Sequence, residues 1–144
     1  MTAVAENTLL EELVAIGRQS DAAIDIVQTA LLLARLDLPD VECAPYCAHL
    51  DDLCAAAVEG ANLVVGLRQV MCEVNGYRGD SETYDNGDNA NLLQVIDRRK
   101  GLPVALGILC IHVARAWGGV INGTAFPSHF LLRLIEGDEL FYLD

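Results

Sequence analysis

Apolar residues recur at helical intervals along the first half of the chain, so we expect helices there. The most regular segment spans residues 21–37, where Ser20 is the expected N-cap and Pro39 the stop. Three further helices are expected, at residues 8–16, 44–60 and 61–76. The segment nearest the N-terminus has the weakest pattern.

The pattern changes after residue 76. Residues 77–90 are polar, acidic and rich in turn-forming residues, with neither helical nor strand periodicity, which predicts a surface loop. A short helix is expected at residues 91–100. A longer one, at residues 102–117, is apolar on nearly every side, which is typical of a central buried helix.

Short runs rich in β-branched and aromatic residues fill the last quarter of the chain and predict a meander of strands. We expect turns at Asn122-Gly123, Pro127-Ser128 and Gly137-Asp138. Alternation along the middle run places Phe130, Leu132 and Leu134 toward the core. His129 then points away from it. Helices first and strands last indicate an α+β fold, in which an antiparallel sheet packs one face on the buried helix.

The composition fits one compact domain. A chain of 144 residues with 53% hydrophobic content has enough apolar side chain for one core. We expect a single domain over residues 1–144. Its parts are a helical region at about 1–76, the loop at about 77–90, and the central helix with the sheet at about 91–144.

Charge and cysteine content exclude several classes of function. A net charge of −12 would repel nucleic acid and anionic membranes, so neither is an expected partner. The five cysteines contain no CxxC pair, which fits a reduced cytoplasm better than a disulfide framework or a zinc site.

Acidic residues near the N-terminus argue against a signal peptide. The longest apolar stretch, Leu102–Ile111, is too short to span a bilayer.

Several clusters of chemically active side chains have a simpler structural interpretation. The set Cys43, Cys47, His49 and Cys54 lacks a recognised ligand spacing, and we expect it to pack within a helix. The acidic set Asp80, Glu82, Asp85 and Asp88 lacks the EF-hand pattern and is expected in a solvated loop. The basic set Arg98, Arg99 and Lys100 is expected to pair with acids of the chain itself rather than with an anion at the helix N-terminus. His112 is expected to be a packed or partly exposed helix residue. We therefore expect no metal and no cofactor.

Residues 77–144 carry a series of motifs in a fixed order. The acidic loop is followed by "VIDRRKGLP" at the entrance to the central helix, and then by "FPSHFLLRL" and "FYLD" in the strands. In this order the motifs resemble the SirB family of bacterial transglutaminase-like proteins. The resemblance covers nearly half of the chain and implies a cysteine-protease-like core.

In such a core, a Cys at the N-terminus of the central helix works with a His and an Asp on adjacent strands. The helix N-terminus and the imidazolium lower the pKa of the thiol. The resemblance implies that His129 matches the base and Asp144 the orienting carboxylate, while Pro103 stands at the nucleophile position. Proline has no nucleophile. Cys110 lies seven residues further on, roughly 10 Å along the helix, and is expected to be a structural thiol in the core.

Two features depart from the family pattern. The motif Pro-Gly-His-Phe reads Pro-Ser-His-Phe at residues 127–130. Ser128 is expected to point away from the ring of His129, because adjacent strand residues face opposite sides. The chain also ends at Asp144, where family members continue, so we expect a truncated chain.

Three functional hypotheses follow. The first is a non-catalytic transglutaminase-like domain, a pseudoenzyme whose cleft acts as a binding or regulatory module. The second is a hydrolase or transferase that uses His129 and Asp144 with a non-cysteine mechanism. The third is an assembly or regulatory protein that binds a protein partner through its N-terminal helices. No pattern indicates a small-molecule ligand or an oligomeric state.

Overall fold

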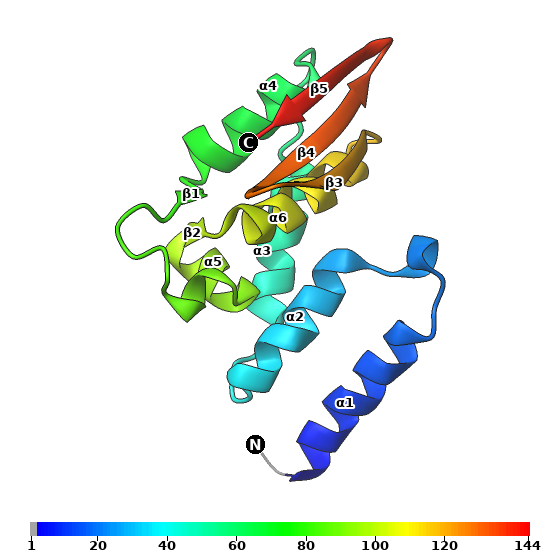
Figure 1. Cartoon of the computed structure of the whole chain (residues 1–144), viewed down its shortest axis with the longest axis vertical. Helices are drawn as coiled ribbons and strands as arrows, with labels where there is room; N and C mark the ends of the chain where they lie inside the picture. Colours follow the sequence, from blue (N-terminus) through cyan, green and yellow to red (C-terminus); the bar gives the residue numbers. More distant parts are fainter. Residues whose placement is uncertain (1–2) are drawn as a thin grey trace.

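The computed structural model describes residues 3–144, in which helices pack around α6 and a three-stranded sheet lies on one side (Figure 1). The helices are α1 (Ala3–Gly17), α2 (Ile26–Asp37), α3 (Ala44–Ala55), α4 (Leu63–Arg68), α5 (Leu92–Arg98) and α6 (Pro103–Ala116). The strands are β1 (Arg78–Gly79), β2 (Lys100–Gly101), β3 (Val120–Phe126), β4 (His129–Glu136) and β5 (Glu139–Leu143). Short 3-10 helices η1 (Asp21–Ala23) and η3 (Gly87–Asn89) and a π-helical turn η2 (Gln69–Val74) complete the chain. The predicted α+β fold is confirmed. The first two residues of the expected domain lie outside the described range.

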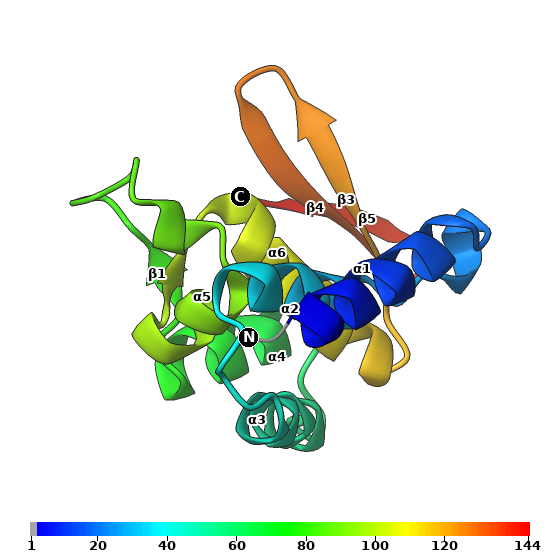
Figure 2. The ribbon, with the colours of Figure 1, turned by 90° about the horizontal axis from the view of Figure 1, so that it is seen from below.

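The main sheet is antiparallel in the order β3-β4-β5. Leu132 and Leu134 of β4 are buried and Phe130 is half-buried, as their alternation predicts, and this face packs on α6. Figure 2 shows the β3–β4 hairpin projecting from the helical body. A second pairing joins the two-residue strands β1 and β2 in parallel, which ties the chain before the loop to the start of α6.

The predicted turn at Asn122-Gly123 is wrong, because β3 continues through both residues and Gly123 pairs with Leu132. The glycine serves a close approach instead. A Cβ atom at Gly123 would lie 2.7 Å from the ring of Phe130, which packs across the strand. A glycine inside a strand pattern indicates such a contact as readily as it indicates a turn.

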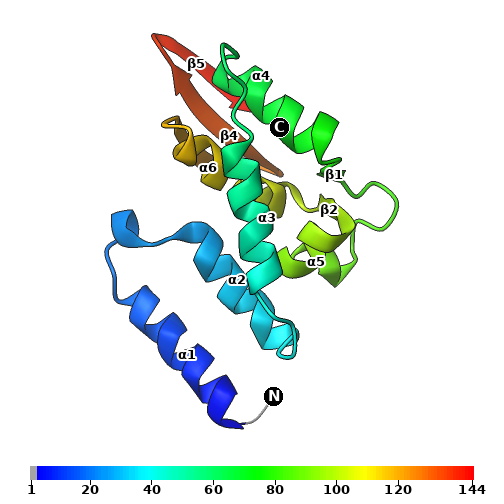
Figure 3. The ribbon, with the colours of Figure 1, turned by 180° about the vertical axis from the view of Figure 1, so that it is seen from behind.

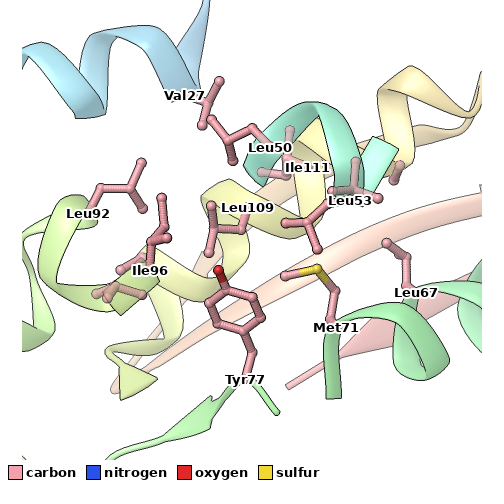
Figure 4. Close-up of a cluster of buried hydrophobic side chains, with 14 of the residues drawn as sticks. Val27, Leu50, Leu53, Leu67, Met71, Tyr77, Leu92, Ile96, Leu109 and Ile111 are labelled. Atoms are coloured by element: carbon pink, nitrogen blue, oxygen red, sulfur yellow. The ribbon is translucent and has the colours of Figure 1, made fainter. Parts of the chain in front are cut away.

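Helix α6 forms the centre of the hydrophobic core, as its apolar pattern predicts. Leu109 and Val113 are fully buried, and residues from α2, α3, η2 and α5 pack around them (Figure 4). On the side of α6 that faces the sheet, Gly107 meets the ring of Phe130 so closely that a Cβ atom would collide with it. The core therefore joins the helical part to the sheet through α6.

The N-terminal helices differ in detail from the prediction. Residues 21–23 form a 3-10 turn, and α2 begins only at Ile26, so its N-cap is Asp25 rather than Ser20. Asp25 Oδ1 accepts a hydrogen bond of 3.1 Å from the backbone N–H of Gln28. Helix α1 lies beside α2, away from the sheet (Figures 1 and 3). Within residues 3–144, no helix combines the length and the apolar character needed to cross a membrane.

Candidate functional site

A cleft of about 590 Å³ lies where α4, η2 and β1 face the first turns of α6 and the sheet. Its deeper walls are apolar, and Leu67, Met71 and Leu132 among them are buried in the core. Figure 4 shows Leu67, Met71 and Tyr77 side by side at this edge of the core. The cleft is lined by Val64, Leu67, Arg68, Met71, Cys72, Tyr77, Arg78, Gly79, Pro103, Leu106, Gly107, Cys110, Phe130, Leu132, Leu143 and Asp144.

Pro103 is the first residue of α6 and lines this cleft. Leu102, the N-cap residue, has an extended backbone and makes no capping hydrogen bond through its side chain. Proline is well suited to the first helical position, because its missing N–H would have no partner within the helix. The position that the resemblance assigns to a nucleophile therefore faces a cleft and carries only a pyrrolidine ring.

His129 and Asp144 lie close together at the end of the sheet. His129 Nδ1 is 3.8 Å from Asp144 Oδ2, and the two side chains are 62% and 67% exposed. Among the described residues, only Asp144 of this pair lines the cleft. The positive φ of Ser128, 64°, belongs to the tight turn that brings His129 to the start of β4. The structure thus brings together a solvated His–Asp pair at the border of the cleft.

Cys110 packs against the hydrophobic core, as expected, and is half-buried because it also lines the wall of the cleft. Helix α6 presents one side to the cleft over at least two turns, from Pro103 to Cys110. Burial, with a smaller effect from the nearby Cys72, raises the pKa of the Cys110 thiol to about 12. Cys72 is exposed and also lines the cleft. The helical pattern of residues 61–76 does not indicate that Cys72 lines a cleft, because residue spacing does not predict the π-helical turn of η2.

The loop beside the cleft is held by a buried polar network centred on Asn89, which is fully buried. Arg98 donates from Nη2 to Asp80 Oδ2 at 3.1 Å and from Nη1 to Asn89 Oδ1 at 3.0 Å. Asp80 is 5% exposed, so the expectation of a solvated acidic loop is wrong for this residue. Hydrogen bonds from Thr83 hold the pKa of the Asp80 carboxyl well below its usual range. Sequence reasoning missed Asn89, because a buried asparagine in a polar loop has no periodic signal.

The three basic residues before α6 separate into two roles. Arg98 pairs with Asp80, and Lys100 Nζ lies 3.9 Å from Glu82 Oε2, so both pair with acids of the chain as predicted. Arg99 does not. It adopts a left-handed conformation with φ of 58° at the end of α5, which directs its side chain elsewhere.

Arg99 instead joins His49 and Tyr77. Its guanidinium carbon lies 5.0 Å from the centroid of the Tyr77 ring, and its Nη1 lies 3.2 Å from His49 Nε2. Tyr77 Oη is 2.8 Å from the same nitrogen. Because a guanidinium only donates, Nε2 accepts. Burial and the charge of Arg99 lower the pKa of His49. The described residues contain no group of three or more His, Cys, Asp or Glu side chains placed to hold a metal ion. Cys43 at the N-cap of α3, and Cys47 and Cys54 within the helix, pack against the core.

A central helix that begins at a cleft, packed on an antiparallel sheet that carries a His–Asp pair at its end, defines a transglutaminase-like core. The model of the transglutaminase-like superfamily matches residues 44–144, and the chain belongs to this superfamily. The match includes α3 and everything after it, so the helices α1 and α2 lie outside the matched region.

Two kinds of relatives are similar to this chain. A UPF0162 protein of Xylella fastidiosa is 31% identical over 131 residues, which cover 86% of this chain and 47% of the relative. A UPF0162 protein of Vibrio cholerae is 43% identical over 70 residues, covering 48% of this chain and 26% of the relative. F-box only protein 21 of Mus musculus is 40% identical over 78 residues, covering 54% of this chain and 12% of the relative. The chain therefore spans about half the length, or less, of the curated relatives it matches. No solved structure matches it.

Proposed function

We propose that this chain is a non-catalytic, SirB-type transglutaminase-like domain whose cleft acts as a binding or regulatory surface. The observation that carries the proposal is Pro103, which lines the cleft at the first position of α6. A nucleophile at this place would benefit from the helix N-terminus, and proline supplies none. The cleft persists although the group that would react in it is absent.

The thiols that do line the cleft support a binding role. Cys110 lies two turns further along α6 than Pro103, and a pKa of about 12 leaves its thiol protonated at neutral pH. Cys72 is exposed and belongs to η2 rather than to the first turn of α6. Neither has the position of an activated thiol. All five cysteines are free, which suits a protein of the reducing cytoplasm.

The test is an assay for turnover on the purified full-length protein. Substrates are a glutaminyl peptide with an amine acceptor, for acyl transfer, and an activated ester, for hydrolysis. We expect rates equal to those of the buffer alone in the wild-type protein and in the variants His129→Ala and Cys110→Ala. Turnover that disappears in His129→Ala and persists in Cys110→Ala would overturn the proposal.

The same assay addresses a second candidate, a hydrolase or transferase in which His129 and Asp144 activate water or a substrate hydroxyl. The proximity of the two side chains favours it, because the electrostatic attraction between them acts at the 3.8 Å that separates His129 Nδ1 from Asp144 Oδ2, a distance beyond hydrogen-bond range. Solvent exposure of about two-thirds on both side chains weakens that effect. This candidate requires Asp144→Asn to abolish turnover as His129→Ala does.

A third candidate is assembly with a protein partner through the N-terminal helices. The exposed apolar residues Val4, Leu10 and Val14 lie on α1, outside the superfamily match, and support this candidate. Co-purification with a partner that is lost on changing Leu10 and Val14 to serine, with the cleft intact, would select it.

A further inference from the structure

The cleft over Pro103 combines apolar walls with charged groups at its surface. Its volume of about 590 Å³ is in the range of sites that enclose small ligands or a short stretch of peptide. Leu67, Met71 and Leu132 provide the deeper apolar surface. An occupant must therefore present apolar side chains to the walls, while its polar groups remain near the opening.

Two arginines among the lining residues contribute positive charge to the cleft. Arg68 on α4 and Arg78 on β1 both line it, in a chain with only 9 basic residues and a net charge of −12. Within residues 3–144 the exposed side chain of Arg78 has no ion pair. Arg68 Nε lies 3.6 Å from Glu73 Oε1, but both side chains are more than half exposed, so the pair is weak. Both guanidinium groups are available to a carboxylate.

The sheet contributes the opposite charge. Asp144, which follows β5, is 67% exposed and also lines the cleft. Positive and negative groups around one apolar cleft match an occupant that carries both a carboxylate and hydrogen-bond donors. A fatty acid would satisfy the arginines but offers no hydrogen-bond donor to Asp144.

Two strands at the cleft have unpaired sides. In the described part of the chain β1 pairs only with β2, and β5 pairs only with β4. Arg78 and Gly79 of β1, and Leu143 at the end of β5, line the cleft. A strand paired on one side leaves N–H and C=O groups that an extended peptide can use. A Cβ atom at Gly79 would meet nothing within 4 Å, so the backbone of β1 is open to approach.

We infer that this cleft binds an extended peptide segment with apolar side chains and an acidic residue, whose carboxylate is held by Arg68 and Arg78. The inference rests on the proposed function, in which the cleft is a binding surface, and it names the class of partner. The apolar side chains occupy the walls, and the peptide main chain supplies donors to Asp144 and to the strands. Recognition of an acidic segment by so acidic a chain depends on these two arginines.

Three fluorescein-labelled hexapeptides of sequence Leu-Val-Phe-Leu-X-Gly, with X as Glu, Gln or Lys, test the inference. Fluorescence polarisation gives the Kd of each for the full chain, for R68Q/R78Q and for the matched control R18Q/R133Q, which loses the same charge outside the cleft. Protection of the exposed Cys72 from iodoacetamide, followed by mass spectrometry, shows whether a peptide occupies the cleft. Circular dichroism verifies that the variants fold.

We expect the Glu peptide to bind about fivefold tighter than the Gln peptide and to protect Cys72, since an exposed ion pair contributes up to about 1 kcal/mol. R68Q/R78Q removes this preference, and R18Q/R133Q retains it. The net charge alone predicts the reverse order, with the Lys peptide binding best.

Equal protection of Cys72 by all three peptides would overturn the inference and leave the proposed function standing. Protection by dodecanoate but by none of the peptides would overturn it in favour of a fatty acid. Turnover that depends on His129 would overturn the proposed function itself, whatever the peptides show. Each result therefore separates the identity of the ligand from the non-catalytic role.

Discussion

Replacement of Asn89 by alanine removes the centre of the network that holds the loop beside the cleft. The Asn89 side chain is fully buried and makes three hydrogen bonds. Its Nδ2 donates to the carbonyls of Thr83 at 2.8 Å and Tyr84 at 3.2 Å, and its Oδ1 accepts from Arg98 Nη1 at 3.0 Å. Alanine leaves two carbonyls and part of a guanidinium without this partner.

The expected loss of stability follows from these contacts. A buried hydrogen bond contributes about 1 kcal/mol net, so three bonds give about 3 kcal/mol, and the buried partners left without a bond add to the cost. The matched control is Asn86→Ala in the same loop, where one exposed hydrogen bond of 3.0 Å to the N–H of Asp88 is lost. For the control we expect less than about 1 kcal/mol.

Urea unfolding followed by the fluorescence of the single tryptophan measures both variants. With a urea m-value of about 2 kcal/mol/M, the unfolding midpoint of Asn89→Ala should fall by about 1.5 M, with an unchanged slope. Hydrogen exchange of residues 80–89 should accelerate as well. A free energy of unfolding for Asn89→Ala within about 1 kcal/mol of the Asn86→Ala value would refute the reasoning that Asn89 holds the loop.

Three further outcomes are expected. Iodoacetamide at pH 8 should modify Cys72 and spare Cys110, whose pKa is raised to about 12 mainly by burial, and equal rates in mass spectrometry would contradict this. Burial and the charge of Arg99 lower the pKa of His49 below its usual 6.5. The unfolded chain therefore binds a proton at this ring more tightly than the folded chain does, and the free energy of unfolding should fall as the pH drops below 6.5. By NMR, the His49 ring should titrate below pH 6.5 in the wild type, and at a higher pH in Arg99→Met than in the wild type. A wild-type midpoint at or above 6.5 would contradict the placement of Arg99 beside this ring. Trp117→Phe removes the 2.7 Å hydrogen bond that Nε1 donates to a backbone carbonyl of α3. The free energy of unfolding, measured in urea by circular dichroism, should fall by about 1 kcal/mol. An unchanged unfolding midpoint would be inconsistent with that bond.

The order of the longer helices and of the strands β3 to β5 was predictable because most of these elements carry a local pattern. The apolar character of α6 and the alternation along β4 each reflect burial on a known face. The turn placed at Gly123 was wrong, because glycine has two structural uses and only the neighbouring Phe130 distinguishes them. Local pattern thus located the elements but not the contacts between them.

The candidate site was predictable only in part. The resemblance placed Pro103, His129 and Asp144, and the structure puts Pro103 and Asp144 in one cleft. The resemblance did not indicate Arg78, because a single arginine in a polar loop belongs to no sequence pattern. Only the pairing of β1 with β2 places it at the cleft. Long-range pairings of this kind depend on tertiary packing rather than on local sequence.

Gly107 gives one wall of the cleft its position without offering a side chain to any ligand. A methyl group there would favour the helix by about 1 kcal/mol, yet it would collide with the ring of Phe130. Relief requires the ring, or the whole of β4, to move outward from α6. The close packing of β4 on α6 along this wall consequently depends on the absence of a side chain at residue 107.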